Sequence, residues 1–156
     1  MEVDTYYQQQ MNPYNIKPFE NADQEQIIKV WEKSVLATHD FLLHEDFVEL
    51  KALVQTINFH QLEVYCLEQN LEIVGFMGIV GQKIEMLFLS PEHIGKGQGR
   101  QLVLYAIQKH NVNKVDVNEQ NQKALNFYQK LGFRAFDRSE KDDQGKPYPI
   151  VRMEYS

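Results

Sequence analysis

Residues 93–104 read H-I-G-K-G-Q-G-R-Q-L-V-L, a glycine-rich stretch that follows the apolar run Ile84–Leu89. Three glycines alternate within it: Gly95, Gly97 and Gly99. Glycine allows positive φ and lets a ligand approach the backbone closely. The N–H groups at a helix start also point outward, with the positive end of the helix dipole behind them. Because apolar residues with helical spacing follow, the order strand, glycine loop and helix predicts a site for a phosphorylated ligand.

Spacing excludes the two commonest phosphate-binding motifs. A P-loop requires Ser or Thr after its Gly-Lys pair, whereas Gly97 follows Lys96 here. A dinucleotide-binding G-x-G-x-x-G motif requires a third glycine where this chain has Arg100 or Leu102. Two interpretations remain: a phosphate site of another kind, with Lys96 and Arg100 adding positive charge, or a glycine-rich surface turn. Three alternating glycines are more than a turn needs, which favours the binding site.

The composition is that of an ordinary globular domain, with 43% hydrophobic and 24% charged residues among 156. A formal net charge of −6 argues against a nucleic-acid partner, which needs a basic face. The single cysteine, Cys66, is expected to be a buried thiol in a reducing compartment. No apolar stretch reaches ~18 residues and no signal peptide is recognisable, so we expect a cytoplasmic protein without a membrane partner. We expect one domain at residues 13–156, after a polar extension at residues 1–12.

Hydrophobic periodicity and turn residues predict seven strands and four helices. The expected strands are Tyr14–Phe19, Leu62–Glu68, Glu72–Val80, Ile84–Leu89, Lys114–Val117, Phe133–Arg138 and Ile150–Tyr155. The expected helices begin at Asp23, Glu45, the glycine loop and Asn121, with Asn21 or Asp23 as a cap for the first. Leu62–Glu68 and Glu72–Val80 form an expected hairpin with its turn at Gln69-Asn70. Irregular alternation of strands and helices favours an α/β architecture, a mixed sheet covered by helices.

A second motif lies in residues 115–133, V-D-V-N-E-Q-N-Q-K-A-L-N-F-Y-Q-K-L-G-F. Here the chain resembles the GNAT superfamily, the GCN5-related N-acetyltransferases, whose corresponding helix carries N-x-x-A-x-x-F-Y-x-x-x-G-F. The matching residues are Asn121, Ala124, Phe127, Tyr128, Gly132 and Phe133. The acyl-CoA loop of that superfamily, R/Q-x-x-G-x-G/A, is matched by Gly97 and Gly99, but Ile94 replaces its first residue. The resemblance spans residues 14–155 and implies a single-domain α/β (α+β) GNAT-like fold. In that fold a mixed, mostly antiparallel sheet of about six to seven strands is flanked by four helices.

A closer similarity links the chain to the YjaB-type acetyltransferases of bacteria. It rests on four segments: A-T-H-D-F-L at 37–42, V-G-F-M at 74–77, V-N-E-Q-N at 117–121, and R-S-E-x-D-D-x-G-K-P-Y-P at 138–149. The last two are long enough to be improbable as coincidence.

The resemblance implies an N-acetyltransferase that moves an acetyl group from acetyl-CoA to a primary amine by direct attack. The backbone of Leu87, Phe88 and Leu89 would pair with the pantetheine arm, as an added strand pairs with a sheet edge. The pyrophosphate would lie against the loop residues Gly95, Lys96, Gly97, Gln98, Gly99 and Arg100. Asn118 and Asn121 are further candidates for coenzyme contacts, although Asn121 is equally explained as a plain helix cap.

Proton transfer and amine binding add four more candidate residues. By resemblance, Tyr128 is the general acid for the departing thiolate, and its ordinary pKa of ~10 keeps it protonated at neutral pH. A lysine-like amine is only about 0.04% neutral at pH 7, so a proton acceptor is needed, and Glu85 stands where relatives often carry one. His39 and Asp40 are expected to line the acceptor pocket, and His39 has an ordinary pKa near neutrality. The structural alternatives are a core tyrosine at Tyr128 and a solvent-facing charge at Glu85.

Several alternatives stay open at this point. A metal site is not expected, because His39 and His44 are five residues apart and do not share a helical face. A GNAT-like module that binds acyl-CoA without turnover is the alternative to an enzyme. The acceptor is either a small-molecule or a peptide amine, and an exposed closing strand is compatible with a homodimer. The polar loop 142–149 either borders the acceptor site or only joins two strands.

Overall fold

The computed structural model describes residues 14–156, so the predicted extension at residues 1–12 lies outside the described part of the chain. Seven strands form one sheet in the order β1-β2-β3-β4-β5-β7-β6. The strands are β1 (Tyr14–Pro18), β2 (Glu63–Gln69), β3 (Glu72–Val80), β4 (Lys83–Leu89), β5 (Lys114–Asn118), β6 (Phe133–Ser139) and β7 (Ile150–Tyr155). All neighbouring strands are antiparallel except β4 and β5, which are parallel. The predicted mixed, mostly antiparallel sheet is therefore confirmed.

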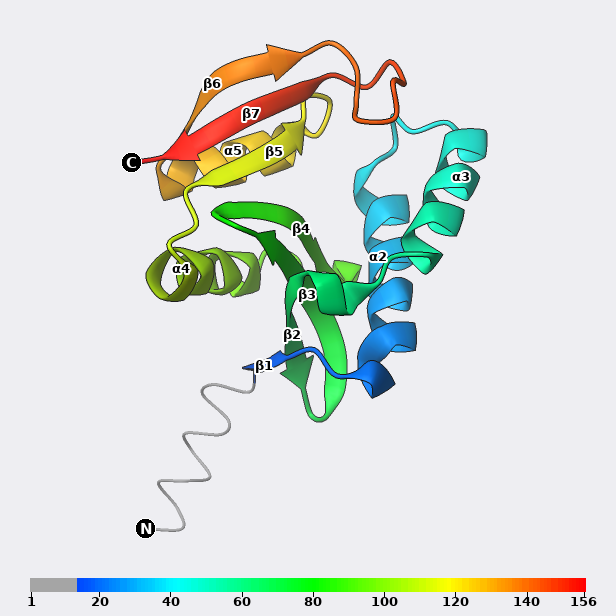
Figure 1. Ribbon diagram of the computed structural model, residues 1–156, viewed down its shortest axis with the longest axis vertical. Helices are drawn as coiled ribbons and strands as arrows, with labels where there is room; N and C mark the ends of the chain where they lie inside the picture. The colour runs from blue at the N-terminus through cyan, green and yellow to red at the C-terminus, as the bar shows by residue number, and fades with distance from the viewer. Residues whose placement is uncertain (1–13) are drawn as a thin grey trace.

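Helices cover both faces of this sheet (Figure 1). They are α2 (Gln24–Thr38), α3 (His44–Gln55), α4 (Gln98–His110) and α5 (Gln122–Leu131), with short 3₁₀ turns at Asn21–Asp23, Phe59–Gln61 and Pro91–His93. On one face α2 and α3 bury Trp31 and Phe47 against Phe76 of the sheet. On the other face α4 and α5 bury Leu102 and Tyr128 in a second cluster. Within residues 14–156, no helix combines the length and apolar character needed to cross a membrane.

The β2–β3 hairpin forms as predicted, but its turn is displaced by one residue. The sequence predicts the turn at Gln69-Asn70, whereas the residues with positive φ are Asn70 (52°) and Leu71 (68°). Two-residue hairpin turns with positive φ at both positions match the right-handed twist of the flanking strands. Asparagine tolerates this conformation, and Leu71 adopts it because the strand pairing imposes it.

The start of α2 differs from the predicted cap. Asp23 precedes Gln24, but its side chain makes no capping hydrogen bond to that helix. The Asp23 carboxylate instead accepts from the Glu20 main-chain N–H at 2.9 Å and from Lys17 Nζ at 2.8 Å. These bonds close the 3₁₀ turn before α2 and tie it to β1.

The β3 strand packs closely against the end of β4 at Gly75. A Cβ atom there would lie 2.5 Å from Leu89 Cδ2 and 3.1 Å from the Phe88 carbonyl oxygen. Only glycine allows β3 to approach the end of β4 this closely. The glycine therefore helps to fix the segment of β4 that borders the site described below.

The two parallel strands separate after a short contact. Their register contains only the pairs Lys83↔Lys114 and Ile84↔Val115, both at the starts of β4 and β5. Residues 87–89 of β4 pair with β3 on one side and have no strand partner on the other among residues 14–156. The sheet is thus divided between β4 and β5, with α4 and α5 on one side of the opening and α2 and α3 on the other (Figure 1).

Candidate active site

The glycine loop before α4 has the conformation that an anion site requires. Gly95 and Gly97 have φ of 81° and 86°, and nothing lies within 4 Å of a Cβ atom built on either. Gly99 has a different reason to be glycine, because a Cβ atom there would lie 3.3 Å from the Phe127 ring of α5. The first two glycines therefore shape the loop, and the third lets α4 pack against α5.

The main-chain N–H groups of this loop form a row of donors at the start of α4. The N–H of Ile94 donates to the Pro91 carbonyl at 3.2 Å, and the next main-chain donor with an acceptor is Gln101, which donates to Gly97 at 3.1 Å. Within residues 14–156, the N–H groups of residues 95–100 have no hydrogen-bond acceptor. Backbone donors that lack partners at a helix start are the groups that bind phosphate oxygens in proteins. The loop therefore fits a diphosphate.

Two side-chain features of the loop agree with a ligand site. Lys96 and Arg100 are exposed beside the free N–H groups and supply positive charge. The Gln98 Oε1 atom is buried and has no hydrogen-bond partner among the described residues. A buried polar atom without a partner is rare in proteins and costs stability unless a ligand or water satisfies it. Ile94, which replaces the Arg or Gln of the superfamily motif, is 43% exposed.

Tyr128 lies in α5 and is only 6% exposed. Its ring packs edge-on against Phe127 and Phe133, with centroids 4.9 Å and 5.4 Å away. Burial raises the pKa of its phenol above the ordinary value, because a phenolate would lose its hydration. Tyr128 is therefore protonated at neutral pH, as a general acid must be. The same packing also fits a core tyrosine, so its catalytic role stays a prediction.

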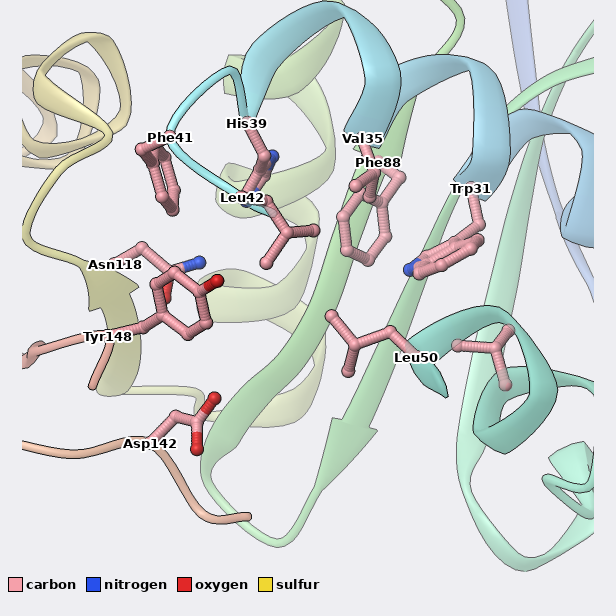
Figure 2. Close-up of a pocket in the computed structure, with 11 residues that line it drawn as sticks. Trp31, Val35, His39, Phe41, Leu42, Leu50, Phe88, Asn118, Asp142 and Tyr148 are labelled. Carbon is pink, nitrogen blue, oxygen red and sulfur yellow. The ribbon is translucent and has the colours of Figure 1, made fainter. Parts of the chain in front are cut away.

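A cavity of about 180 Å³ lies between α2, α3, the ends of β4 and β5, and the loop before β7. Its walls are mainly apolar: Trp31, Val35, Phe41, Leu42, Leu50, Val54 and Phe88. The polar residues that line it are His39, Asn118, Asp142 and Tyr148 (Figure 2). Phe88 and Asn118 come from the two strands that separate, so the cavity borders the opening in the sheet.

Of the two residues predicted to line the acceptor pocket, the structure places only one in the cavity wall. His39 lines the cavity, whereas Asp40 is exposed and not among the described residues that line it. The His39 Nδ1 atom lies 2.7 Å from the Thr38 hydroxyl oxygen. Burial lowers the pKa of the His39 imidazole, and the neighbouring Asp40 carboxylate only partly opposes this shift. His39 is therefore a neutral imidazole at pH 7.

The loop before β7 borders the cavity, so residues 142–149 do more than join two strands. Tyr148 is buried, donates its hydroxyl hydrogen to Asp46 and accepts from the Leu43 N–H at 3.2 Å. Lys146 pairs with Asp46 at 3.0 Å. The Tyr148 hydroxyl and the Lys146 ammonium hold the pKa of Asp46 below its usual range. The loop is therefore fastened to the start of α3.

Glu85 lies apart from the cavity. Its carboxylate pairs with Lys83 Nζ at 3.5 Å, its side chain is 38% exposed, and it is not among the described residues that line the cavity. Lys83 also pairs with Asp116 of β5. This position is compatible with the alternative interpretation of Glu85 as a surface charge.

Asn121 caps α5, because its Oδ1 atom accepts the Ala124 N–H at 3.2 Å. The side-chain amide N–H₂ group of Asn121 is not used by this bond, so a coenzyme contact stays a prediction. Cys66 is buried, as expected, and burial raises its pKa to about 12. A thiol with that pKa is not a nucleophile at neutral pH, which agrees with direct transfer.

The sequence does not distinguish Trp31 as a cavity residue, and it places Asp142 and Tyr148 only in a loop that either borders the acceptor site or joins two strands. The run D-D-x-G-K-P-Y-P signals a stiff polar loop, but not the surface that it faces. Trp31 is one of several apolar residues on the buried face of α2, and nothing in the sequence distinguishes it from the core. These residues are identified only by their position around the cavity.

The divided sheet, the free N–H groups and the adjoining cavity define an acyltransferase of the GNAT type. The chain matches the model of the acetyltransferase (GNAT) domain over residues 20–156 and belongs to that family. It is an N-acetyltransferase, as the two sequence motifs predict. The YjaB protein of Salmonella typhimurium, a peptidyl-lysine N-acetyltransferase, is 40% identical over 142 residues, which cover 90% of this chain and 97% of that relative.

Solved structures agree with this assignment. The solution structure of apo-form YjaB from Escherichia coli is 38% identical, with a TM-score of 0.84, and the match covers 91% of this chain and 97% of that one. The PaiA N-acetyltransferase of Thermoplasma acidophilum, solved in complex with coenzyme A, has a TM-score of 0.67 at 23% identity, with 91% and 99% covered. The second similarity concerns the fold alone.

Proposed function

We propose that this enzyme uses acetyl-CoA to acetylate the side-chain amine of lysine in a peptide or protein. The observation that carries the proposal is the row of N–H groups at residues 95–100, which has no acceptor among the described residues and lies at the start of α4. This row follows β4 after the 3₁₀ turn Pro91–His93. The edge of β4 at residues 87–89, which has no second strand partner among residues 14–156, leads to the cavity. One extended ligand with a diphosphate at one end and a thioester at the other matches that arrangement.

In this proposal the loop holds the pyrophosphate, and Lys96 and Arg100 offset its charge. The main chain of residues 87–89 pairs with the amide groups of the pantetheine arm, since β5 has diverged from this edge. The buried Gln98 Oε1 atom, which has no partner within the described part of the chain, is a further acceptor for a coenzyme N–H group. Asn118 lies where the thioester end would meet the cavity, and its side-chain amide would orient that end.

A lysine side chain fits the cavity chemically. Its four methylene groups match the apolar walls, and its amine needs polar neighbours at the inner end. Asp142 contributes a carboxylate on the cavity wall (Figure 2). Its Oδ1 atom accepts from the N–H groups of Gln144 and Lys146, at 3.0 Å and 2.8 Å, which leaves Oδ2 for a cationic amine. The names of the YjaB relatives support the same acceptor class.

The residues proposed for the chemistry are Tyr128 as the acid and a proton acceptor near the amine. Tyr128 would donate a proton to the sulfur as it leaves, and its raised pKa keeps the proton available. Glu85 remains the acceptor that the resemblance predicts. Cytoplasmic location and a homodimer also stay predictions, the second testable by light scattering.

The test is acetylation of a set of peptides that differ only in the amine offered. We expect release of free thiol and an acetylated product with a peptide containing lysine and a blocked N-terminus, but not with its Nε-acetylated counterpart. Thiol release with a free N-terminal amine alone would contradict lysine as the acceptor. Binding of acetyl-CoA without thiol release from any amine would instead support the alternative, an acyl-CoA-binding module without turnover.

A further inference from the structure

We propose that the Nε2 atom of His39 accepts the proton of the attacking amine, and that Thr38 holds His39 in the tautomer that this requires. The inference rests on the proposed function, because it names a catalytic residue for that reaction. It also selects among the candidate proton acceptors, and the group that it selects lies in the cavity rather than on the exposed side of β4.

The tautomer follows from the number of hydrogens available. The Thr38 hydroxyl oxygen lies 2.7 Å from the Ser34 carbonyl oxygen and 2.7 Å from His39 Nδ1. A carbonyl oxygen can only accept, so the single hydroxyl hydrogen of Thr38 is donated to Ser34. Thr38 must then accept from His39, and Nδ1 carries the hydrogen. In a neutral imidazole, this leaves Nε2 with a free lone pair.

The position of the ring suits this role. His39 ends α2 as its C-cap, and its N–H donates to the Val35 carbonyl at 2.9 Å, which fixes the backbone. The ring packs against Phe41, with centroids 5.2 Å apart, and lines the cavity together with Asn118 and Tyr148 (Figure 2). Two side-chain contacts and one main-chain bond therefore orient the imidazole before any acceptor enters.

The charge state agrees with the tautomer argument. Burial lowers the pKa of His39 below that of a free imidazole, and the adjacent Asp40 opposes the shift. The other titratable groups that line the cavity are Asp142 and Tyr148, and the Tyr148 hydroxyl is already engaged with Asp46. The facing residues of α2, α3, β4 and β5, including Trp31, Leu50 and Phe88, carry no charge. At pH 7 His39 is thus a base with its lone pair available.

The proposed step joins attack by the amine to loss of the thiolate. The neutral amine forms a bond from nitrogen to the acetyl carbon, and the proton on that nitrogen passes to His39 Nε2. The carbon–sulfur bond breaks with its electron pair on sulfur, and Tyr128 protonates the sulfur. The proton on His39 then returns to Tyr128 through solvent, so both residues regain their starting states. The products are the acetylated amine and free coenzyme A.

The test compares His39→Asn with His44→Asn. Asparagine at position 39 keeps a donor for the Thr38 hydroxyl but removes Nε2, whereas His44 is exposed at the start of α3 and lines no part of the cavity. We expect kcat/KM of His39→Asn for a lysine peptide to fall roughly 10²- to 10³-fold, the usual contribution of a positioned base. The affinity for acetyl-CoA should stay within about twofold, and His44→Asn should resemble the wild type.

A pH profile distinguishes catalysis from a structural effect. In the wild type, log kcat/KM should rise with a slope of two at low pH, where both His39 and the amine must lose a proton. It should rise with a slope of one above the pKa of His39, which burial places below ~6.5. In His39→Asn the slope should be one throughout.

Two outcomes would overturn the proposal. Wild-type kcat/KM in His39→Asn would remove His39 from the reaction while leaving the proposed function intact. A large loss of kcat/KM in Glu85→Gln, together with a small loss in His39→Asn, would show that Glu85 is the proton acceptor. If the wild type acetylated no lysine peptide, the proposed function would fail first and His39 would fail with it.

Discussion

The two halves of the site are built in opposite ways. The loop at residues 95–100 presents main-chain N–H groups, and its shape depends on glycines at positive φ. The cavity presents side chains that come from α2, α3, β4, β5 and the loop before β7. A loop of backbone donors can hold the same diphosphate whatever the acceptor is, whereas a cavity of side chains can be changed residue by residue. In the proposed site the coenzyme half is therefore general, and we expect the acceptor half to carry the specificity.

The largest effect is expected from Tyr128→Phe, because this change removes the proposed general acid. It leaves both the glycine loop and the residues that line the cavity unchanged. Turnover should fall by roughly 10²- to 10⁴-fold, while the affinity for acetyl-CoA stays nearly unchanged. Thiol release measures the first quantity and calorimetry the second. Turnover at the wild-type rate would show that Tyr128 is only a core tyrosine.

Gly97→Ala tests the backbone half. Alanine at φ of 86° should distort the loop at a cost of about 1–2 kcal/mol, which corresponds to a roughly 5- to 30-fold weaker affinity for acetyl-CoA. Gly81→Ala is the matched control, because Gly81 has φ of 60° and open space around it, but lies in the β3–β4 turn. Equal loss of affinity in the two variants would argue against a role for the loop in binding.

Tyr148→Phe tests the side-chain half. Without its hydroxyl the loop before β7 loses its hydrogen bonds to Asp46 and Leu43, so KM for the peptide should rise up to about tenfold. The acetyl-CoA affinity should not change. Tyr155→Phe serves as the control, since Tyr155 packs on Phe133 in β7 and lines no part of the cavity. A similar rise in KM for both variants would show that the hydrogen bonds of Tyr148 to Asp46 and Leu43 do not shape the peptide site.

The smallest effect concerns the pH dependence of stability. The pKa of Asp46 is lowered in the folded protein, so its contribution is present above the unfolded value of ~3.9 and is lost as the pH falls through the folded value. Denaturant unfolding should therefore show Asp46→Asn to be less stable than the wild type at pH 7. The difference should shrink at pH 3. A difference of the same size at both pH values would rule out ionised Asp46 as its source.

Prediction from the sequence succeeded where the signal was local. The segment 93–104 indicates the loop and the start of α4, and Asn121 indicates the cap of α5, which its bond to Ala124 confirms. It failed for Asp23, which offers a typical capping side chain but bonds instead to Glu20 and Lys17. Lys17 of β1 binds the carboxylate that would otherwise cap α2. The sequence of the helix alone does not reveal this contact with a neighbouring strand.

His39 shows the same limit within the site. Its identity and its place between two helices indicate a pocket residue, but the ordinary pKa of histidine leaves its charge at pH 7 undecided. Burial against Phe41 and the bond to Thr38 assign a neutral ring with a free Nε2. Asp40, its neighbour in the sequence, is exposed and outside the cavity lining, a difference that the segment A-T-H-D-F-L does not reveal.

The amino-acid sequence alone specifies the order of elements and the glycine loop, because backbone conformation depends on residues close together in the chain. It also specifies membership of a family, because the two motifs are continuous segments of the chain. The separation of β4 from β5, the cavity beside it and the protonation of His39 arise from contacts between segments up to about a hundred residues apart, such as Tyr148 with Asp46, which are 102 apart. Burial and charge are properties of those contacts. They exist only once the chain is packed.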